Sequence, residues 1–204
     1  MTLQKKHTGS MDPTGEQTSI EAIEAALAGL NVDSTGAFIA GGSTTGLFAG
    51  EGNLSSQLSV AGIGNGADTT DDVLFTYTLP AGALDVQGRA ITITAYGKLG
   101  ATANNKNVKL WFGATVVATT GVVATNTGGW QLQADVAKVG AAGSNTQIAQ
   151  GQNIVAATHG GVNIPPAPTE VESGPIVIKV TGASSTTGAA NDVLGQFFQV
   201  NWQN

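Results

Sequence analysis

From residue 68 onward, short segments alternate between apolar and polar residues, and this alternation limits the fold more than any other feature of the chain. Successive side chains of a β-strand point to opposite faces, so a period of two indicates a strand with one buried and one solvated face. The segments are rich in β-branched and aromatic residues and are bounded by Gly, Asn, Pro or Ser, which favours strands separated by tight turns. We predict strands at residues 72–79, 89–97, 107–113, 115–119, 130–139, 146–150, 175–182 and 193–202.

Seven or eight such strands in one region predict an all-β fold, an antiparallel sandwich or barrel. The alternation also assigns side chains to faces. In the first segment, Val73, Phe75 and Tyr77 are expected on one face, and Leu74 is expected on the other face with two threonines.

The composition agrees with a fold of short strands and turns. Only 11% of the residues are charged and 29 are glycine, so Thr, Ser, Asn and Gln must supply most of the polar surface. The hydrophobic fraction of 41% is enough for a core. A chain of 204 residues has room for one ordinary domain and an arm.

Charge and cysteine content exclude several classes of function. The net charge is −6 and the eight Lys and Arg residues form no cluster, which disfavours nucleic-acid binding. The absence of cysteine excludes disulfides, thiolate zinc sites and a cysteine nucleophile. No apolar run approaches the ~18 residues of a membrane span, and the first 30 residues lack the apolar core of a signal peptide. We therefore expect a soluble protein with no nucleic-acid partner and no membrane partner.

Residues 18–30 carry the one helical pattern that we find. Thr18 precedes Glu21 by three residues, which is the spacing of a capping box. An apolar stripe follows at spacings of three, four and three, formed by Ile20, Ile23, Leu27 and Leu30. A helix this short is marginal alone in water, so we expect the stripe to serve attachment or oligomerisation. Docking on a protein surface is favoured, and a helical bundle between subunits is the alternative because the spacing also fits heptad positions.

These patterns divide the chain into three parts. Residues 1–34 are predicted to form an N-terminal extended arm with the short amphipathic helix, residues 35–67 a Gly/Ser/Thr-rich connector, and residues 68–204 the sandwich. A segment with the connector's composition either links two parts passively or lies along a partner's surface, where it can contribute an edge strand. The sequence leaves both interpretations open.

No pattern supports catalysis. A Ser-His-Asp triad needs a histidine held by a carboxylate and facing a nucleophile. The two histidines, His7 and His159, lie in a polar tail and a glycine-rich loop, and no serine has the surroundings of a nucleophile elbow. No lysine follows a glycine cluster at the spacing of a phosphate loop. We expect a protein without enzymatic activity and without a cofactor.

The carboxylates give only weak candidates for acid–base or metal chemistry. Asp71 and Asp72 are adjacent, so a strand would point them to opposite faces. Glu170 and Glu172 share a face but follow a Pro-rich segment. Asp68 could join the aspartates in a calcium site, but no EF-hand spacing is present and such residues more often form Asx turns. We predict no metal site, although a catalytic pair assembled from distant positions stays open.

Flat aromatic side chains on a β-scaffold can stack against sugar rings. Trp111 and Trp130 are the candidate glycan contacts, in a set that also includes Tyr77, Tyr96 and Trp202. The alternative is that these aromatics lie in the core or in a subunit contact, which is the usual role of strand aromatics.

The run from Asp68 to Val117 resembles a sequence type found in phage virion proteins, and the run from Thr186 to Trp202 is similar to the closing strand of that type. The resemblance covers roughly residues 65–204 and brings no catalytic residues. Four elements carry it: a strand that ends in Leu79-Pro80, an I-x-I-x-A-x-G strand at 91–97, a T-A-N-N-K loop at 102–106 and a K-L-W-F-G strand at 109–113.

This resemblance implies a jelly-roll-like antiparallel β-sandwich, a homotrimer and a location in the virion, either in the head or in the tail. We expect a non-enzymatic structural protein, in the first place a capsid decoration or head-fibre protein. Its partner would be the major capsid protein or another virion protein, bound through residues 1–64. The alternative is a tail-fibre tip adhesin that binds a host surface glycan.

Overall fold

The computed structural model describes residues 30–32, 38–40, 52–124, 128–160 and 167–203, which fall in two compact units, Met1–Leu47 and Phe48–Asn204. In the smaller unit, strands β1 (Leu30–Val32) and β2 (Phe38–Ala40) form an antiparallel pair. The prediction that Leu30 ends a helix is therefore wrong. In the sequence, the glycine at position 29 disfavours continuing a helical pattern to Leu30. The apolar and β-branched residues Val32, Phe38 and Ile39 favour strands. The other stripe residues, Ile20, Ile23 and Leu27, lie outside the described residues.

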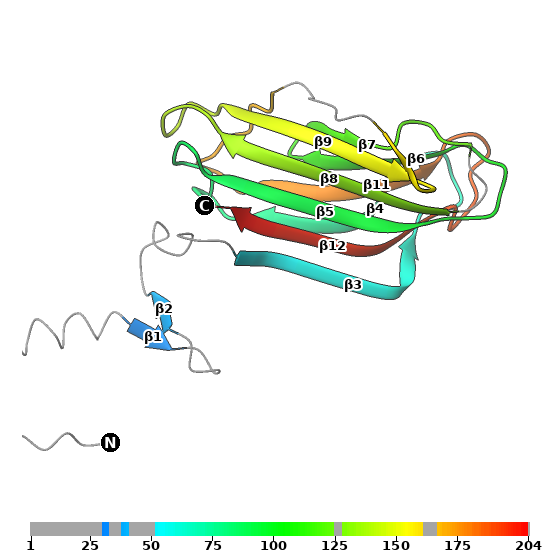
Figure 1. The fold of residues 1–204 in the computed structure, drawn as a ribbon, viewed down its shortest axis with the longest axis horizontal. Helices are drawn as coiled ribbons and strands as arrows, with labels where there is room; N and C mark the ends of the chain where they lie inside the picture. The colour runs from blue at the N-terminus through cyan, green and yellow to red at the C-terminus, as the bar shows by residue number, and fades with distance from the viewer. Residues whose placement is uncertain (1–29, 33–37, 41–51, 125–127, 161–166, 204) are drawn as a thin grey trace, which may run out of the picture. The chain divides into compact units, whose positions relative to one another are not determined.

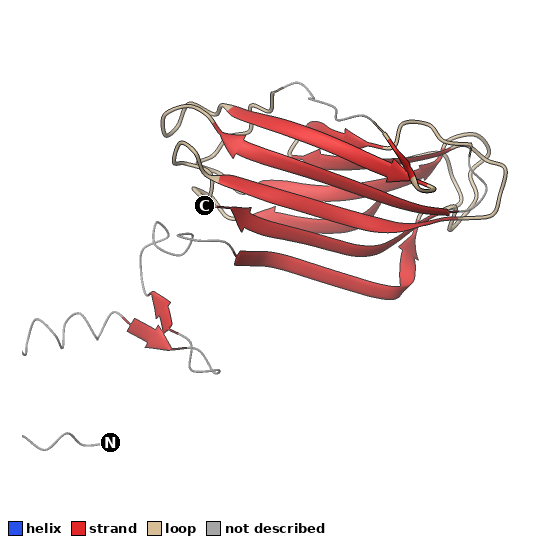
Figure 2. Cartoon of the chain, viewed as in Figure 1, coloured by secondary structure: helices blue, strands red, loops and turns tan. Residues whose placement is uncertain are grey.

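The larger unit consists of two antiparallel sheets that face each other (Figure 1). One sheet has six strands in the order β10-β9-β8-β5-β12-β3, and the other has four in the order β4-β11-β6-β7. Its described residues contain strands and loops but no helix (Figure 2). The strands are β3 (Gly52–Gly64), β4 (Asp72–Leu79), β5 (Ala90–Leu99), β6 (Lys106–Phe112), β7 (Thr115–Thr119), β8 (Gly128–Lys138), β9 (Gln147–Val155), β10 (Thr158–His159), β11 (Ile176–Ser184) and β12 (Val193–Gln203).

The pairing of these strands is that of a jelly roll. Four antiparallel pairs are nested along the chain: β3 with β12, β4 with β11, β5 with β8, and β6 with β7. From the outermost pair to the innermost, successive pairs lie alternately in the six-stranded and the four-stranded sheet. Strands β9 and β10 extend the six-stranded sheet beyond β8. The predicted all-β, jelly-roll-like sandwich is confirmed.

The sandwich begins at Gly52 and not at residue 68, because part of the predicted connector forms β3 and pairs with β12. This segment shows little alternation, with Ser, Gln and Gly between its apolar residues. An edge strand is paired on one side only, and here no large apolar side chain of the strand is fully buried. The alternation of apolar and polar residues that predicted the other strands is therefore weak in β3.

The inward faces of the two sheets form the core. Ile91, Ile93 and Ala95 of β5 are fully buried, as the alternation predicts. Phe75 of β4 and Phe198 of β12 come from different sheets and stack with ring centroids 5.8 Å apart. Aromatic stacking of this kind adds to the free energy gained by burying the two rings.

The predicted faces of β4 are wrong at two positions, Val73 and Leu74. The pairing of β4 with β11 shifts between Val180 and Thr181, which lie opposite Phe75 and Val73 respectively. This β-bulge leaves Leu74 without an opposite residue and interrupts the period of two. Leu74 and Phe75 are consequently both buried, whereas Val73 is 52% exposed.

We expect Phe198→Ala to lower the free energy of unfolding by about 3–5 kcal/mol, because it removes a buried ring and leaves a cavity against Phe75. The neighbouring Phe197→Ala is the matched control: it makes the same chemical change at a residue that is not fully buried, and should cost about 1 kcal/mol. Urea unfolding of both variants gives the comparison. Equal losses would contradict the assigned faces of β12.

Candidate functional site

The two tryptophans named as glycan contacts lie in different surroundings. Trp130 is buried in the core, and its indole Nε1 donates a hydrogen bond to the Leu194 carbonyl at 3.1 Å. Trp111 is half-buried, and its Nε1 donates to the Thr181 hydroxyl at 2.9 Å. The ammonium groups of Lys109 and Lys179 lie 5.8 and 5.2 Å from the centre of the Trp111 ring. These cation–π contacts already use the ring of Trp111.

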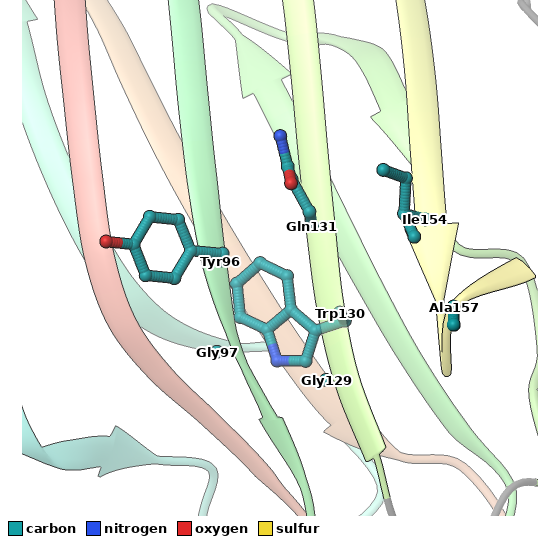
Figure 3. A pocket seen from close by; sticks show the side chains of 7 residues that line it. All are labelled: Tyr96, Gly97, Gly129, Trp130, Gln131, Ile154 and Ala157. Carbon is teal, nitrogen blue, oxygen red and sulfur yellow. The ribbon is translucent and has the colours of Figure 1, made fainter. Parts of the chain in front are cut away.

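A hollow of about 410 Å³ opens on the outer face of the six-stranded sheet, over β5, β8 and β9 (Figure 3). Tyr96, Gln131 and Ile154 lie directly opposite one another on these three strands, so their side chains share the outer face. The remaining lining residues come from the same strands and from the turn before β10: Gly97, Gly129, Trp130 and Ala157.

The hollow exists because one position in the sheet has no side chain. Two residues before Gln131, the outward position of β8 is Gly129. A Cβ placed on Gly129 would meet no atom nearer than the Gly97 carbonyl oxygen, at 3.6 Å. The space above Gly129 is therefore open, and the sheet backbone forms the floor.

Tyr96 forms an aromatic wall of the hollow. Its side chain is directed toward β12 (Figure 3) and stacks on Phe197, with ring centroids 4.8 Å apart and an interplanar angle of 18°. Tyr96 remains 42% exposed. The stack limits the motion of the ring and leaves part of its surface open to solvent.

The polar groups of the lining are amides, and Lys98 of β5 lies directly opposite Gly129 as an exposed charge beside them. Among the described residues, the side chain of Gln131 has no hydrogen-bond partner, whereas Gln133 in the next row accepts a hydrogen bond from Gln152 at 3.0 Å. No charged residue lines the hollow. On the same outer face, Asp135 accepts a hydrogen bond from the Thr92 hydroxyl at 2.5 Å. The hollow can therefore offer a ligand an aromatic surface, an aliphatic surface and a free amide.

Sequence reasoning found part of this site. The alternation places Tyr96 on the polar face of its strand, and Tyr96 was among the aromatic candidates. The sequence did not predict that Gln131, Ile154 and Gly129 belong to the site, since only the strand register brings these residues together. The one local signal was Gly129 directly before a strand with regular alternation.

A buried polar cluster joins the start of β12 to the loop before β6. The carboxylate of Asp192 accepts hydrogen bonds from Thr102 (2.5 Å), Asn104 (2.9 Å) and Ser184 (2.8 Å). The ammonium group of Lys106 donates to the carbonyls of Thr102 and Asn104. Burial raises the pKa of Asp192, but the three hydrogen bonds and the positive charge of Lys106 outweigh it and hold this pKa below its usual value.

A second cluster joins the end of β8 to the segment before β11. Lys138 and Glu172 are both buried and form an ion pair at 2.6 Å. Lys138 also donates to Ser144 at 2.7 Å, and Gln147 donates to the same Glu172 oxygen, Oε1, at 2.5 Å. Among the described residues, Glu172 Oε2 has no hydrogen-bond partner. The hydrogen bonds to Lys138 and to Glu172 Oε1 therefore offset part of the free-energy cost of burying this pair.

The other carboxylates considered above have local partners. Asp68 accepts hydrogen bonds from the hydroxyl and the N–H of Thr70, which lower the pKa of its carboxyl. Asp71 pairs with Lys109 at 2.6 Å, and Asp72 accepts from the Gly66 N–H at 2.7 Å. His159 lies exposed in β10. Within the described ranges, no three His, Cys, Asp or Glu side chains gather as a metal site would require.

Sequence comparisons give no match for this chain. No family model matches the chain, and no curated protein sequence matches it. The described residues include no helix with the length and apolarity that crossing a bilayer demands. The functional assignment therefore depends on the residues and their geometry.

Asp192→Asn should destabilise the protein at neutral pH, because it weakens the counter-charge of the buried Lys106. As the pH falls below about 4, the unfolded chain binds a proton at Asp192 before the folded protein does, so this contribution to stability is lost. The wild-type free energy of unfolding should therefore fall more steeply than that of the variant between about pH 5 and pH 3. Urea titrations across this range measure both slopes, and parallel slopes would refute the assignment.

Glu172→Ala should lower the free energy of unfolding by about 3–5 kcal/mol, since it leaves the charge of Lys138 buried without its partner. The double variant Lys138→Met/Glu172→Leu should recover most of this loss. Asp71→Ala is the matched control, because it breaks an ion pair that is partly exposed and should cost less than about 1 kcal/mol. Thermal or urea unfolding distinguishes the three. A small loss for Glu172→Ala would show that the pair is solvated.

Proposed function

We propose that this protein is a non-enzymatic structural component of a bacteriophage virion. In the first place it would be a capsid decoration or head-fibre protein, a homotrimer whose residues 1–34 attach it to the particle. The resemblance of residues 68–117 and 186–202 to phage virion proteins supports this assignment. The jelly-roll pairing agrees with the fold that this resemblance implies.

The observation that carries the proposal is the edge of the six-stranded sheet. Strand β3 is 13 residues long, contains no charged residue and no proline, and has no partner on its outer edge among the described residues. Leu58 is 70% exposed and Val60 84% exposed on this strand. Natural proteins protect long apolar edges with charges, proline or covering segments, so an edge of this kind favours contact with another chain.

The outer face of the same sheet also suits a large protein contact. It is composed mainly of amide and hydroxyl side chains, and burial of such a face desolvates few charges. Its outward positions include Gln131, Gln133, Gln150, Gln152 and Gln199.

In this function the protein acts by binding to the particle and not by catalysis. The N-terminal segment supplies affinity for the major capsid protein or another virion protein, and three copies in one trimer multiply weak contacts through their effective concentration. The jelly-roll body is then displayed on the surface of the particle.

A tail-fibre tip adhesin that binds a host surface glycan is the second candidate. The observation that favours it is the hollow beside Tyr96, where an exposed aromatic ring lies next to the Gln131 amide. A glycan array probed with the full chain separates the two candidates, because clear binding would favour the adhesin.

The structural proposal predicts a solution mass of about three times 20.4 kDa for the full chain by light scattering. A variant that lacks residues 1–34 should keep a β-rich circular dichroism spectrum and the oligomeric mass, but should no longer sediment with the virions of the phage that encodes it. A monomeric full-length chain would remove the trimer from the proposal. A truncated chain that unfolds would show that residues 1–34 belong to the folded core.

A further inference from the structure

The hollow beside Tyr96 combines three features that match one class of ligand: an exposed aromatic ring, an amide that has no hydrogen-bond partner among the described residues, and a floor without a side chain. We propose that this hollow binds an uncharged sugar ring. The inference deepens the second candidate function by naming the site and the ligand class, and it does not rest on the virion assignment.

The aromatic wall fits the flat, apolar side of a pyranose ring. The C–H groups on that side carry a small positive partial charge, and the face of an aromatic ring is negative. Tyr96 is held in place by its stack on Phe197, so little conformational entropy is lost when a ligand covers it. Ile154 adds an aliphatic contact on the opposite side of Gln131.

The floor lets a ring approach the sheet closely. Gly129 is exposed, and the space that its side chain would fill is open to the Gly97 carbonyl at 3.6 Å. A larger residue at this position would occupy the hollow. Because Gly129 is not among the residues with positive φ, a β-branched residue can replace it without backbone strain.

The polar groups of the lining suit a ligand rich in hydroxyls. The Gln131 amide offers donors and an acceptor, which match hydroxyl groups that both donate and accept hydrogen bonds. The lining residues themselves carry no charge. Lys98, which lies directly opposite Gly129, is exposed beside the hollow, and its ammonium group can also donate a hydrogen bond to a hydroxyl group. The neighbouring Gln133 and Gln152 extend the amide surface along the sheet, so a second sugar unit would find similar partners.

The openness of the hollow limits the affinity of a single ring. A small ligand that is only partly buried is expected to bind with a Kd on the order of millimolar. Binding to a surface that displays many copies of the sugar would then depend on the number of protein subunits that act together.

The proposal is tested on the isotope-labelled full-length protein by titration with methyl glycosides of glucose, galactose, mannose, rhamnose and N-acetylglucosamine. We expect at least one of them to shift the side-chain amide signals of Gln131 and the indole N–H signal of Trp130, which lies at the floor. Gly129→Val fills the hollow and should abolish these shifts. Tyr96→Ala should raise Kd by up to about tenfold, and Tyr96→Phe, which keeps the ring, should bind like the wild type.

Val177→Ala, on an exposed residue of the four-stranded sheet, is the control and should leave the titration unchanged. Each variant must keep a dispersed amide spectrum, which shows that it is folded. The proposal is overturned if no glycoside produces shifts, or if Gly129→Val binds as the wild type does. Binding that survives Gly129→Val but is lost in Trp111→Ala would keep the adhesin candidate and reject the hollow. Neither result affects the solution mass on which the structural proposal depends.

Discussion

The two sheets are held together by the apolar side chains that their inward faces bury, and every other feature of the larger unit depends on this contact. The stack of Phe75 on Phe198 joins β4 of one sheet to β12 of the other. Fully buried residues such as Ile93 and Leu110 fill the space around it. Because these side chains lie on rigid strands, the outward residues between them are also fixed in position. The core thereby determines the outer surface.

The outer surface is where this protein differs from a simple scaffold. Strand register places Tyr96, Gln131 and Ile154 in one row, and Gly129 leaves a gap beside them. The same face has few charges, and it ends in the apolar edge of β3. A surface rich in amides and hydroxyls is less costly to desolvate than a charged one. It therefore suits contacts with sugars or with other subunits, which are the two kinds of partner that we propose.

Buried charges secure the loops that close the roll. Asp192 with Lys106 joins the start of β12 to the loop before β6, and Lys138 with Glu172 joins the end of β8 to the segment before β11. Hydrogen bonds from Ser184 to Asp192 and from Gln147 to Glu172 offset part of the free-energy cost of removing these charges from water. In a chain with so few charged residues, these buried ones have a structural role.

The sequence by itself determined the strands with strong alternation and most of their inward faces, because a period of two depends only on local geometry. It did not determine strand β3 or the face of Leu74, because an edge strand and a β-bulge are defined by the neighbouring strand. The hollow and the buried Lys138–Glu172 ion pair could not be predicted either, since strand register and the packing of loops on the sheets bring their residues together. Local periodicity depends on the sequence alone, whereas the strand register and the contact partners of each side chain are determined only when the two sheets form and pack.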